Sequence, residues 1–267
     1  MLMRYTINIL CFSLFCLLFN CQHVFAQKSV PEPRLDRFLD WTIKDPIHIL
    51  KSTSQKELGT FLLAGVGIAG VSAHDTYFSS LLQSRFKNNR YLTATNEVGT
   101  FKFVGPLSAA VFGTSLLTDN HKFQDAAFTS LQSVLYTNFT ANAAKFMFAR
   151  ERPDHFEGPY DFEFFEANAT SFPSGHTSTA FAMVVPWVVY YPNAVTYSML
   201  ALPVSTAIAR VSKGRHWISD VTAGALIGAY WGYKLSKRHL NITNNDNIDV
   251  TPFFGHNSGG LSLKVSF

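Results

Sequence analysis

The chain contains few cysteines and few charged residues. Its three cysteines, Cys11, Cys16 and Cys21, all lie near the N-terminus, so the rest of the chain cannot form disulfides, use a thiol nucleophile or build a cysteine-based zinc site. Asp, Glu, Lys and Arg together make up 15% of the residues, whereas an average soluble domain has about 25%. This shortage of charge indicates a membrane protein, or a helical protein that rests on a membrane.

Long basic runs are also absent. The net charge is only +4 at pH 7 over 267 residues, whereas a nucleic-acid-binding domain carries a concentrated basic surface. We therefore expect no nucleic-acid partner. The length suffices for one domain with a substantial apolar core.

The first 26 residues have the pattern of a secretory signal peptide. Arg4 supplies the positive charge, residues 7–19 form a short apolar stretch, and residues 24–26 (Val-Phe-Ala) provide a cleavage site. The alternative is an uncleaved anchor, although this stretch is short for a membrane span, which needs about 20 residues. Either interpretation places the protein in the cell envelope.

Composition divides the chain into four segments. Leu35, Phe38 and Trp41 recur at helical spacing in a polar, proline-containing lead-in, which predicts a short amphipathic helix. Residues 261–267 alternate between apolar and polar, which predicts a strand. The predicted segments are the signal peptide (1–26), the polar lead-in (27–57), a helical domain (58–240), and a polar linker with a strand-like tail (241–267).

The predicted helical domain contains several stretches without charged residues. Most are shorter than about 20 residues or diluted by polar ones, so each fits either a thin membrane span or a buried helix. The longest is interrupted at residues 191–193 (Tyr-Pro-Asn), which predicts two helices. We predict an all-α bundle of about six apolar helices, membrane-embedded or membrane-associated, with a short C-terminal β-type tail. The stretches are Leu58–His74, Phe103–Thr118, Ala126–Ala144, His176–Ala209 and Val221–Tyr233.

Glycines recur within two of these stretches. Gly65, Gly67 and Gly70 give the first stretch a small-residue face, which predicts close packing against another helix. In the last stretch glycines recur at every fourth position, at Gly224, Gly228 and Gly232.

Residues 173–176 (Pro-Ser-Gly-His) form the most distinctive polar motif. Ser174 precedes a long apolar run, so we expect it to cap the N-terminus of a helix. Gly175 lets the backbone approach a ligand closely, and the free N–H groups of a helix N-terminus bind phosphate. His176 should lie in the first turn and face the same anion.

A second motif consists of Arg210, His216 and Asp220. The histidine and the aspartate are four residues apart, so on a helix they share one face. The carboxylate can accept the Nδ1 proton of the imidazole, which leaves Nε2 as a nucleophile. Taken alone, this pair also fits an ordinary surface pair.

Earlier in the chain, Lys145 and Arg152 are followed by a proline. They are two helical turns apart, and a proline ends a helix near the residue that precedes it. Both cations should therefore lie at one helix tip, where they suit phosphate oxygens. Arg150 and Glu151, between them, are expected to form a solvated pair outside the site.

All three motifs lie where an apolar helix meets a polar loop. If the helices alternate in direction, the motifs fall at the same end of the bundle. Three cations, two histidines and a carboxylate would then converge. Such a set can hold a phosphate and break its ester without a metal.

In this order and spacing, the motifs resemble the signature of the type-2 phosphatidic acid phosphatase and vanadium haloperoxidase superfamily. The resemblance covers about residues 58–235. One position differs, because the superfamily usually has Ser where this chain has Ala209. That Ser is an accessory phosphate contact, so its loss should weaken anion binding slightly.

The resemblance implies a helical phosphatase that needs no metal or other cofactor and forms a phosphohistidine. His216 is implied as the nucleophile, Asp220 as the residue that orients it, and His176 as the acid that protonates the leaving group and then activates water. The residues implied to bind phosphate are Lys145, Arg152, Ser174, Gly175 and Arg210.

Several functions remain open within this resemblance. The apolar helices favour hydrolysis of a lipid or prenyl phosphomonoester or pyrophosphate at a periplasm-facing site of the inner membrane. An aromatic loop at residues 160–165 either contacts a lipid tail or packs over the site. The signal peptide instead favours a soluble periplasmic acid phosphatase that acts on small phosphoesters. A haloperoxidase and a non-catalytic envelope protein are further alternatives.

Overall fold

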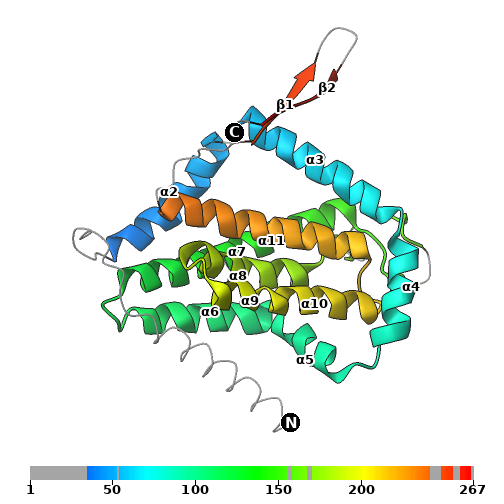
Figure 1. Ribbon diagram of the computed structural model, residues 1–267, viewed down its shortest axis with the longest axis horizontal. Coiled ribbons are helices and arrows are strands. Elements are labelled where there is room, and N and C mark those ends of the chain that lie inside the picture. Colours follow the sequence, from blue (N-terminus) through cyan, green and yellow to red (C-terminus); the bar gives the residue numbers. More distant parts are fainter. Residues whose placement is uncertain are drawn as a thin grey trace. The chain divides into compact units, whose positions relative to one another are not determined.

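The structure, a computed structural model, describes residues 35–52, 54–155, 158–166, 170–240, 248–254 and 259–265. The predicted signal peptide and the linker at residues 241–247 lie outside this part. The described part is mainly helical (Figure 1). Its helices are α2 (Asp36–Ser52), α3 (Gln55–Ser72), α4 (Asp75–Phe86), α5 (Arg90–Val98), α6 (Phe101–Ser115), α7 (His121–Phe148), α8 (Gly175–Tyr190), α9 (Ala194–Met199), α10 (Ala201–Ser212) and α11 (Ile218–His239), with a 3-10 turn at Pro153–His155.

The charge-free stretches are mainly helical, and the longest spans α8, α9 and α10, so the predicted helical bundle is confirmed. The predicted break is also found, because α8 ends at Tyr190 and Asn193 caps α9 with its side chain. The lead-in forms α2, in which Phe38 is buried. Two helices were not predicted: α4 and α5 contain charged residues, so no charge-free stretch marks them.

Helices α7, α8 and α11 form the centre of the bundle. In Figure 1, α11 packs along α8 and α7, and α6 packs against α7. Val104 of α6, Val134 of α7 and Ala182 of α8 meet in a buried apolar cluster. On the other side, α10 packs against α8, α5 and α4. These helix contacts hold the ends of α7, α8, α10 and α11 in fixed positions.

A two-stranded hairpin follows the helices in the chain. Strand β1 (Ile248–Phe254) pairs antiparallel with β2 (Gly259–Val265), and Ile248 is opposite Val265. Residues 261–265 of the alternating segment lie in β2.

Glycines allow the backbones of α8 and α11 to touch. A Cβ atom added at Gly224 would lie 2.5 Å from the Ser174 carbonyl oxygen, and one at Gly228 would lie 2.2 Å from the Ser178 carbonyl oxygen. At Gly232 it would lie 2.9 Å from Val185 Cβ. Any side chain at these positions would push the two helices apart.

The glycines of α3 behave differently, and the prediction of close packing there is wrong. A Cβ atom at Gly65, Gly67 or Gly70 would meet nothing within 4 Å. A small-residue face permits close packing but does not create it, because another helix must lie against that face. Among the described helices, the glycine face of α11 is already occupied by α8.

One continuous helical segment in the described part of the chain is long and apolar enough to cross a membrane. It is Ala194–Ser212, with a mean hydropathy of 1.3, and 33% of it is buried in the protein. A second candidate is the pair Glu57–Ser72 and Asp75–Phe86, which is bent by 63°, if the two parts count as one span.

Gly228→Ala should destabilise the fold, because its methyl group would overlap the Ser178 carbonyl. Overpacking of this kind costs about 1–3 kcal/mol. The matched control is Gly65→Ala, whose methyl group meets open space and gains up to about 1 kcal/mol of helix propensity. Thermal unfolding of both variants tests this, and equal unfolding temperatures would contradict it.

Candidate functional site

The three polar motifs lie together at one end of the bundle. Lys145 is in the last turn of α7, His176 in the first turn of α8, and Arg210 in the last turn of α10. The starts of α8 and α11 are joined directly, because the Ser174 N–H donates to the Asp220 carbonyl oxygen at 3.0 Å. The glycine contact between α8 and α11 makes this bond possible.

Ser174 occupies the expected position before α8, but its side chain does not cap the helix. Its hydroxyl lies 3.0 Å from Thr177 Oγ1 instead. The first N–H groups of α8 therefore lack a side-chain acceptor and can donate to an anion. Gly175 lies against the first cation, because a Cβ there would be 3.6 Å from Lys145 Cε.

His216 precedes α11 rather than lying on it, so the expected shared helix face is wrong. Gly214, with φ +68°, turns the chain after α10, and Asp220 is in the first turn of α11. The Asp220 carboxylate accepts the Trp217 N–H at 2.8 Å. His216 Nδ1 lies 3.5 Å from Asp220 Oδ2. A turn, and not a helix face, brings the two together.

The His216 side chain is almost completely buried, with 2% exposed. Burial lowers its pKa to about 3, and the positive charges of Lys145 and Arg210 act in the same direction, while contact with Asp220 opposes them. The imidazole is therefore neutral at neutral pH. With Nδ1 directed at the carboxylate, Nε2 is the atom available to attack an electrophile.

Three cations surround the two imidazoles. Lys145 Nζ donates to the Thr170 carbonyl oxygen, Arg152 donates to the Thr170 hydroxyl at 2.9 Å, and Arg210 donates to Asn96 Oδ1 at 2.9 Å. Thr170 and Asn96, which hold these cations, were missed because neither belongs to a motif. Ala209, which replaces the usual Ser, is fully buried.

The crowding of positive charge is visible in two pKa values. Burial lowers the pKa of Lys145 to about 7; Asp220 opposes this shift, and Arg152 and Arg210 add to it. Burial also lowers the pKa of His176 to about 4, together with Arg210, Lys145 and Arg152. An anion bound here would relieve this repulsion, so the site is suited to one.

The expectation that Arg150 is solvated and outside the site is wrong. Its side chain is 2% exposed and forms ion pairs with Asp75 at 2.7 Å and Asp220 at 2.6 Å. The physical reason is that α7 ends at Phe148, and Ala149 adopts a left-handed conformation with φ +37°. The chain then turns inward instead of continuing as a helix to Arg152.

Asp75, at the start of α4, completes this network. It accepts hydrogen bonds from the Ser219 N–H at 2.9 Å and the Ser219 hydroxyl at 2.6 Å. Ser171 donates to Asp220 Oδ2 at 2.5 Å. Asp220 is therefore fixed from several sides. No pattern in the sequence marks Asp75, whereas Arg150 could have been suspected because a buried carboxylate needs a counter-charge.

Metal binding finds no support in the described ranges. No group of three or more His, Cys, Asp or Glu side chains there is arranged to hold a metal ion. The positive charge of the site comes from lysine and arginine side chains.

The fold resembles that of a known membrane protein. It superimposes on the crystal structure of a transmembrane PAP2-type phosphatidylglycerolphosphate phosphatase from Bacillus subtilis with a TM-score of 0.57 and 20% sequence identity, over 72% of this chain and 100% of that chain. At this identity the likeness concerns the fold alone.

Sequence comparison agrees with the three motifs over part of the chain. Residues 126–243 match the PAP2 superfamily, so this part carries a PAP2 superfamily domain, and the resemblance seen in the motifs is confirmed. The lipid A 1-phosphatase of Rhizobium johnstonii is 33% identical over 103 residues, which is 37% of this chain and 42% of that protein. That of Porphyromonas gingivalis is 35% identical over 118 residues, 36% of this chain and 24% of that protein. The chain thus spans less than half the length of either relative.

Asp75→Asn should destabilise the protein strongly, because the buried Arg150 would lose one of its two carboxylate partners. Breaking a buried ion pair costs about 3–5 kcal/mol. Asp154→Asn is the matched control, since Asp154 pairs with the half-exposed Arg215 at 2.8 Å, and a pair of this kind contributes at most about 1 kcal/mol. Chemical unfolding of both variants measures the difference, and similar losses would contradict the role of Asp75.

Anion affinity should fall as pH rises above about 7, the pKa of Lys145. Below this pH the ammonium is charged and attracts the anion, and above it the charge is lost. Sulfate stays dianionic over this range, so its dissociation constant, measured by calorimetry, should rise about tenfold per pH unit. Lys145→Arg should remove the rise up to about pH 9, because arginine stays protonated. A pH dependence unchanged by Lys145→Arg would exclude Lys145 as its origin.

Proposed function

We propose that this chain is a phosphatase that hydrolyses a lipid phosphate through a phosphohistidine at His216. The observation that supports this most is the environment of His216. A buried, neutral imidazole is held beside Asp220, and the charges of Lys145 and Arg210 act on it. Such a group is a nucleophile placed where an anionic electrophile is attracted.

The first chemical step follows from this geometry. His216 Nε2 attacks phosphorus while the bond from phosphorus to the lipid oxygen breaks. His176 gives its proton to that oxygen, and the lipid leaves as an alcohol. With only the protein charges around it, His176 is neutral at pH 7, because its pKa is about 4. The negative charge of the bound phosphate offsets the three cations and raises this pKa, so His176 carries a proton when it is needed.

In the second step, water replaces the histidine. The neutral His176 takes a proton from water as the oxygen attacks phosphorus, the bond from phosphorus to His216 breaks, and phosphate leaves. Asp220 stabilises the positive charge that His216 carries while phosphorylated. Lys145, Arg152 and Arg210, with the N–H groups at the start of α8, stabilise the oxygens of the transition state.

A lipid substrate is supported by the surface near the site. Tyr160, Phe164 and Phe165 are exposed in the loop that joins the first two motifs, and Phe165 packs against the exposed Phe146 at the end of α7. Aromatic side chains suit the boundary between water and lipid. Because the curated relatives are named lipid A 1-phosphatases, we place a phosphomonoester of lipid A first among the substrates. The site would act at the periplasmic face of the envelope.

A soluble phosphoester is the second candidate substrate. It is favoured by one observation: in the described residues, a single continuous helical segment meets the length and composition of a membrane span. A phosphatase working on small esters in the periplasm would use the same site chemistry.

His216→Ala should abolish phosphate release, with kcat lowered at least ~10³-fold, because the nucleophile is lost. His74→Ala is the matched control, since His74 is exposed at the start of α4 and contacts Phe78; its activity should be unchanged. The assay uses purified protein with EDTA and compares lipid A, phosphatidate and p-nitrophenyl phosphate.

The two parts of the proposal have separate outcomes in this assay. Release that persists in His216→Ala rules out the phosphohistidine. Release that depends on His216 but is faster from p-nitrophenyl phosphate than from either lipid favours the soluble substrate.

A further inference from the structure

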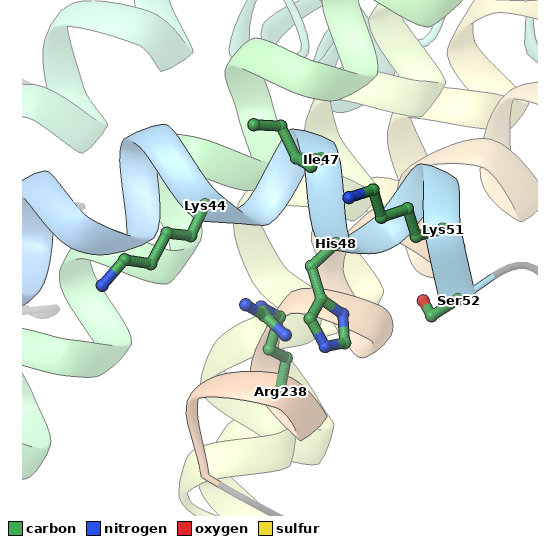
Figure 2. Close-up of a pocket in the computed structure, with 6 residues that line it drawn as sticks. All are labelled: Lys44, Ile47, His48, Lys51, Ser52 and Arg238. Carbon is green, nitrogen blue, oxygen red and sulfur yellow. The ribbon is translucent and has the colours of Figure 1, made fainter.

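A second basic pocket lies at the other end of the bundle. It has a volume of ≈ 470 Å³, within the range of about 300–1,000 Å³ that is typical of small-molecule sites. Figure 2 shows His48 of α2 beside Arg238 of α11, with Lys44 and Lys51 one turn away on either side of His48. The residues that line it are Lys44, Ile47, His48, Lys51, Ser52 and Arg238.

This pocket is distinct from the catalytic end. Arg238 follows Asp220 by 18 residues on the same helix, α11, which corresponds to about 27 Å along the helix axis. None of the residues that line the pocket belongs to the three motifs. Its chemistry therefore needs a separate explanation.

The charge of the pocket is positive. Three of the six lining residues are lysine or arginine, a fourth is histidine, and none is acidic. The nearby Asp45 is buried and already accepts hydrogen bonds from Arg238 Nε and from His239 Nε2, the latter at 2.9 Å. Lys44 pairs with Asp40, but both side chains are more than half exposed, so a bound anion can compete for the ammonium group.

An apolar stripe runs along α2 next to this pocket. Leu39, Ile43 and Ile47 follow one another at intervals of four residues and are 64%, 66% and 54% exposed. Residues at this spacing lie on one face of a helix. Ile47 belongs both to the stripe and to the pocket lining. A ligand bound here thus meets cations and exposed aliphatic side chains side by side.

We propose that this pocket binds the phosphate headgroup of an anionic phospholipid, with the acyl chains along Leu39, Ile43 and Ile47. A free phosphate would use the cations but leave the stripe exposed to water, whereas a phospholipid uses both. Helices with an apolar face flanked by lysine lie in the interface of membranes in this way. The site would fix the α2 end of the bundle to an anionic lipid surface, independently of the phosphatase reaction.

The test measures lipid binding to the full chain in detergent by native mass spectrometry, with phosphatidylglycerol and phosphatidylcholine. The unchanged protein should prefer phosphatidylglycerol. Lys44→Gln with Lys51→Gln should lower phosphatidylglycerol affinity about 30-fold, since each lysine near an anionic lipid surface contributes about one factor of five to six. Phosphatidylcholine binding should stay nearly the same.

Matched controls separate position from overall charge. Lys87→Gln with Lys102→Gln removes the same charge from exposed lysines elsewhere and should keep the preference. Ile43→Ser with Ile47→Ser should weaken both lipids, because the stripe contacts acyl chains. Glycerol 3-phosphate should not compete at concentrations where phosphatidylglycerol saturates the protein.

Three results would overturn the proposal. The first is an unchanged preference in the Lys44 and Lys51 variant, and the second is an equal loss of phosphatidylglycerol affinity in the Lys87 and Lys102 control. The third is full competition by glycerol 3-phosphate, which would assign the pocket to a soluble anion. If the double variant does not fold, Lys51→Gln alone and the salt dependence of the unchanged protein decide, since an electrostatic preference must fall with added salt.

Discussion

The backbone contact between α8 and α11 is the constraint on which the rest of the structure depends. Gly224 and Gly228 let α11 approach the carbonyl groups of α8 more closely than any side chain would permit. This approach brings the start of α8 to the start of α11 and allows the Ser174 N–H to bond the Asp220 carbonyl oxygen. The start of α8 and His216 are thus held in one place by glycine packing that begins at Ser174 itself.

A buried ion network then sets the orientation of the Asp220 carboxylate. Arg150 lies between Asp75 and Asp220, so one cation serves two carboxylates and ties α4 to α11. The network carries a net negative charge, which suits the phosphorylated His216 of the proposed mechanism. Around it, Lys145, Arg152 and Arg210 repel one another until an anion arrives. The buried network of Asp75, Arg150 and Asp220 has an excess of negative charge and stabilises the fold. The neighbouring cluster of Lys145, Arg152 and Arg210 has an excess of positive charge and is suited to an anion.

The two ends of the bundle have different chemistry. At one end the cations surround imidazoles in a buried site suited to phosphoryl transfer. At the other, α2 places lysines beside an exposed aliphatic stripe, which suits binding without reaction. A helical bundle can keep these ends apart because α11 runs between them as one rigid element.

The sequence by itself determined the helices and the three motifs, since charge-free stretches and residue spacing are local properties. It also indicated that Lys145, His176 and Arg210 lie at helix ends. Only the tertiary structure decided that Arg150 is buried, that Asp75 is its partner, and that α11, not α3, packs closely through its glycines. The reason is physical: a counter-charge and a helix contact both need a partner distant in the chain, and neither Asp75 nor the carbonyl groups of α8 leave a local mark in the sequence.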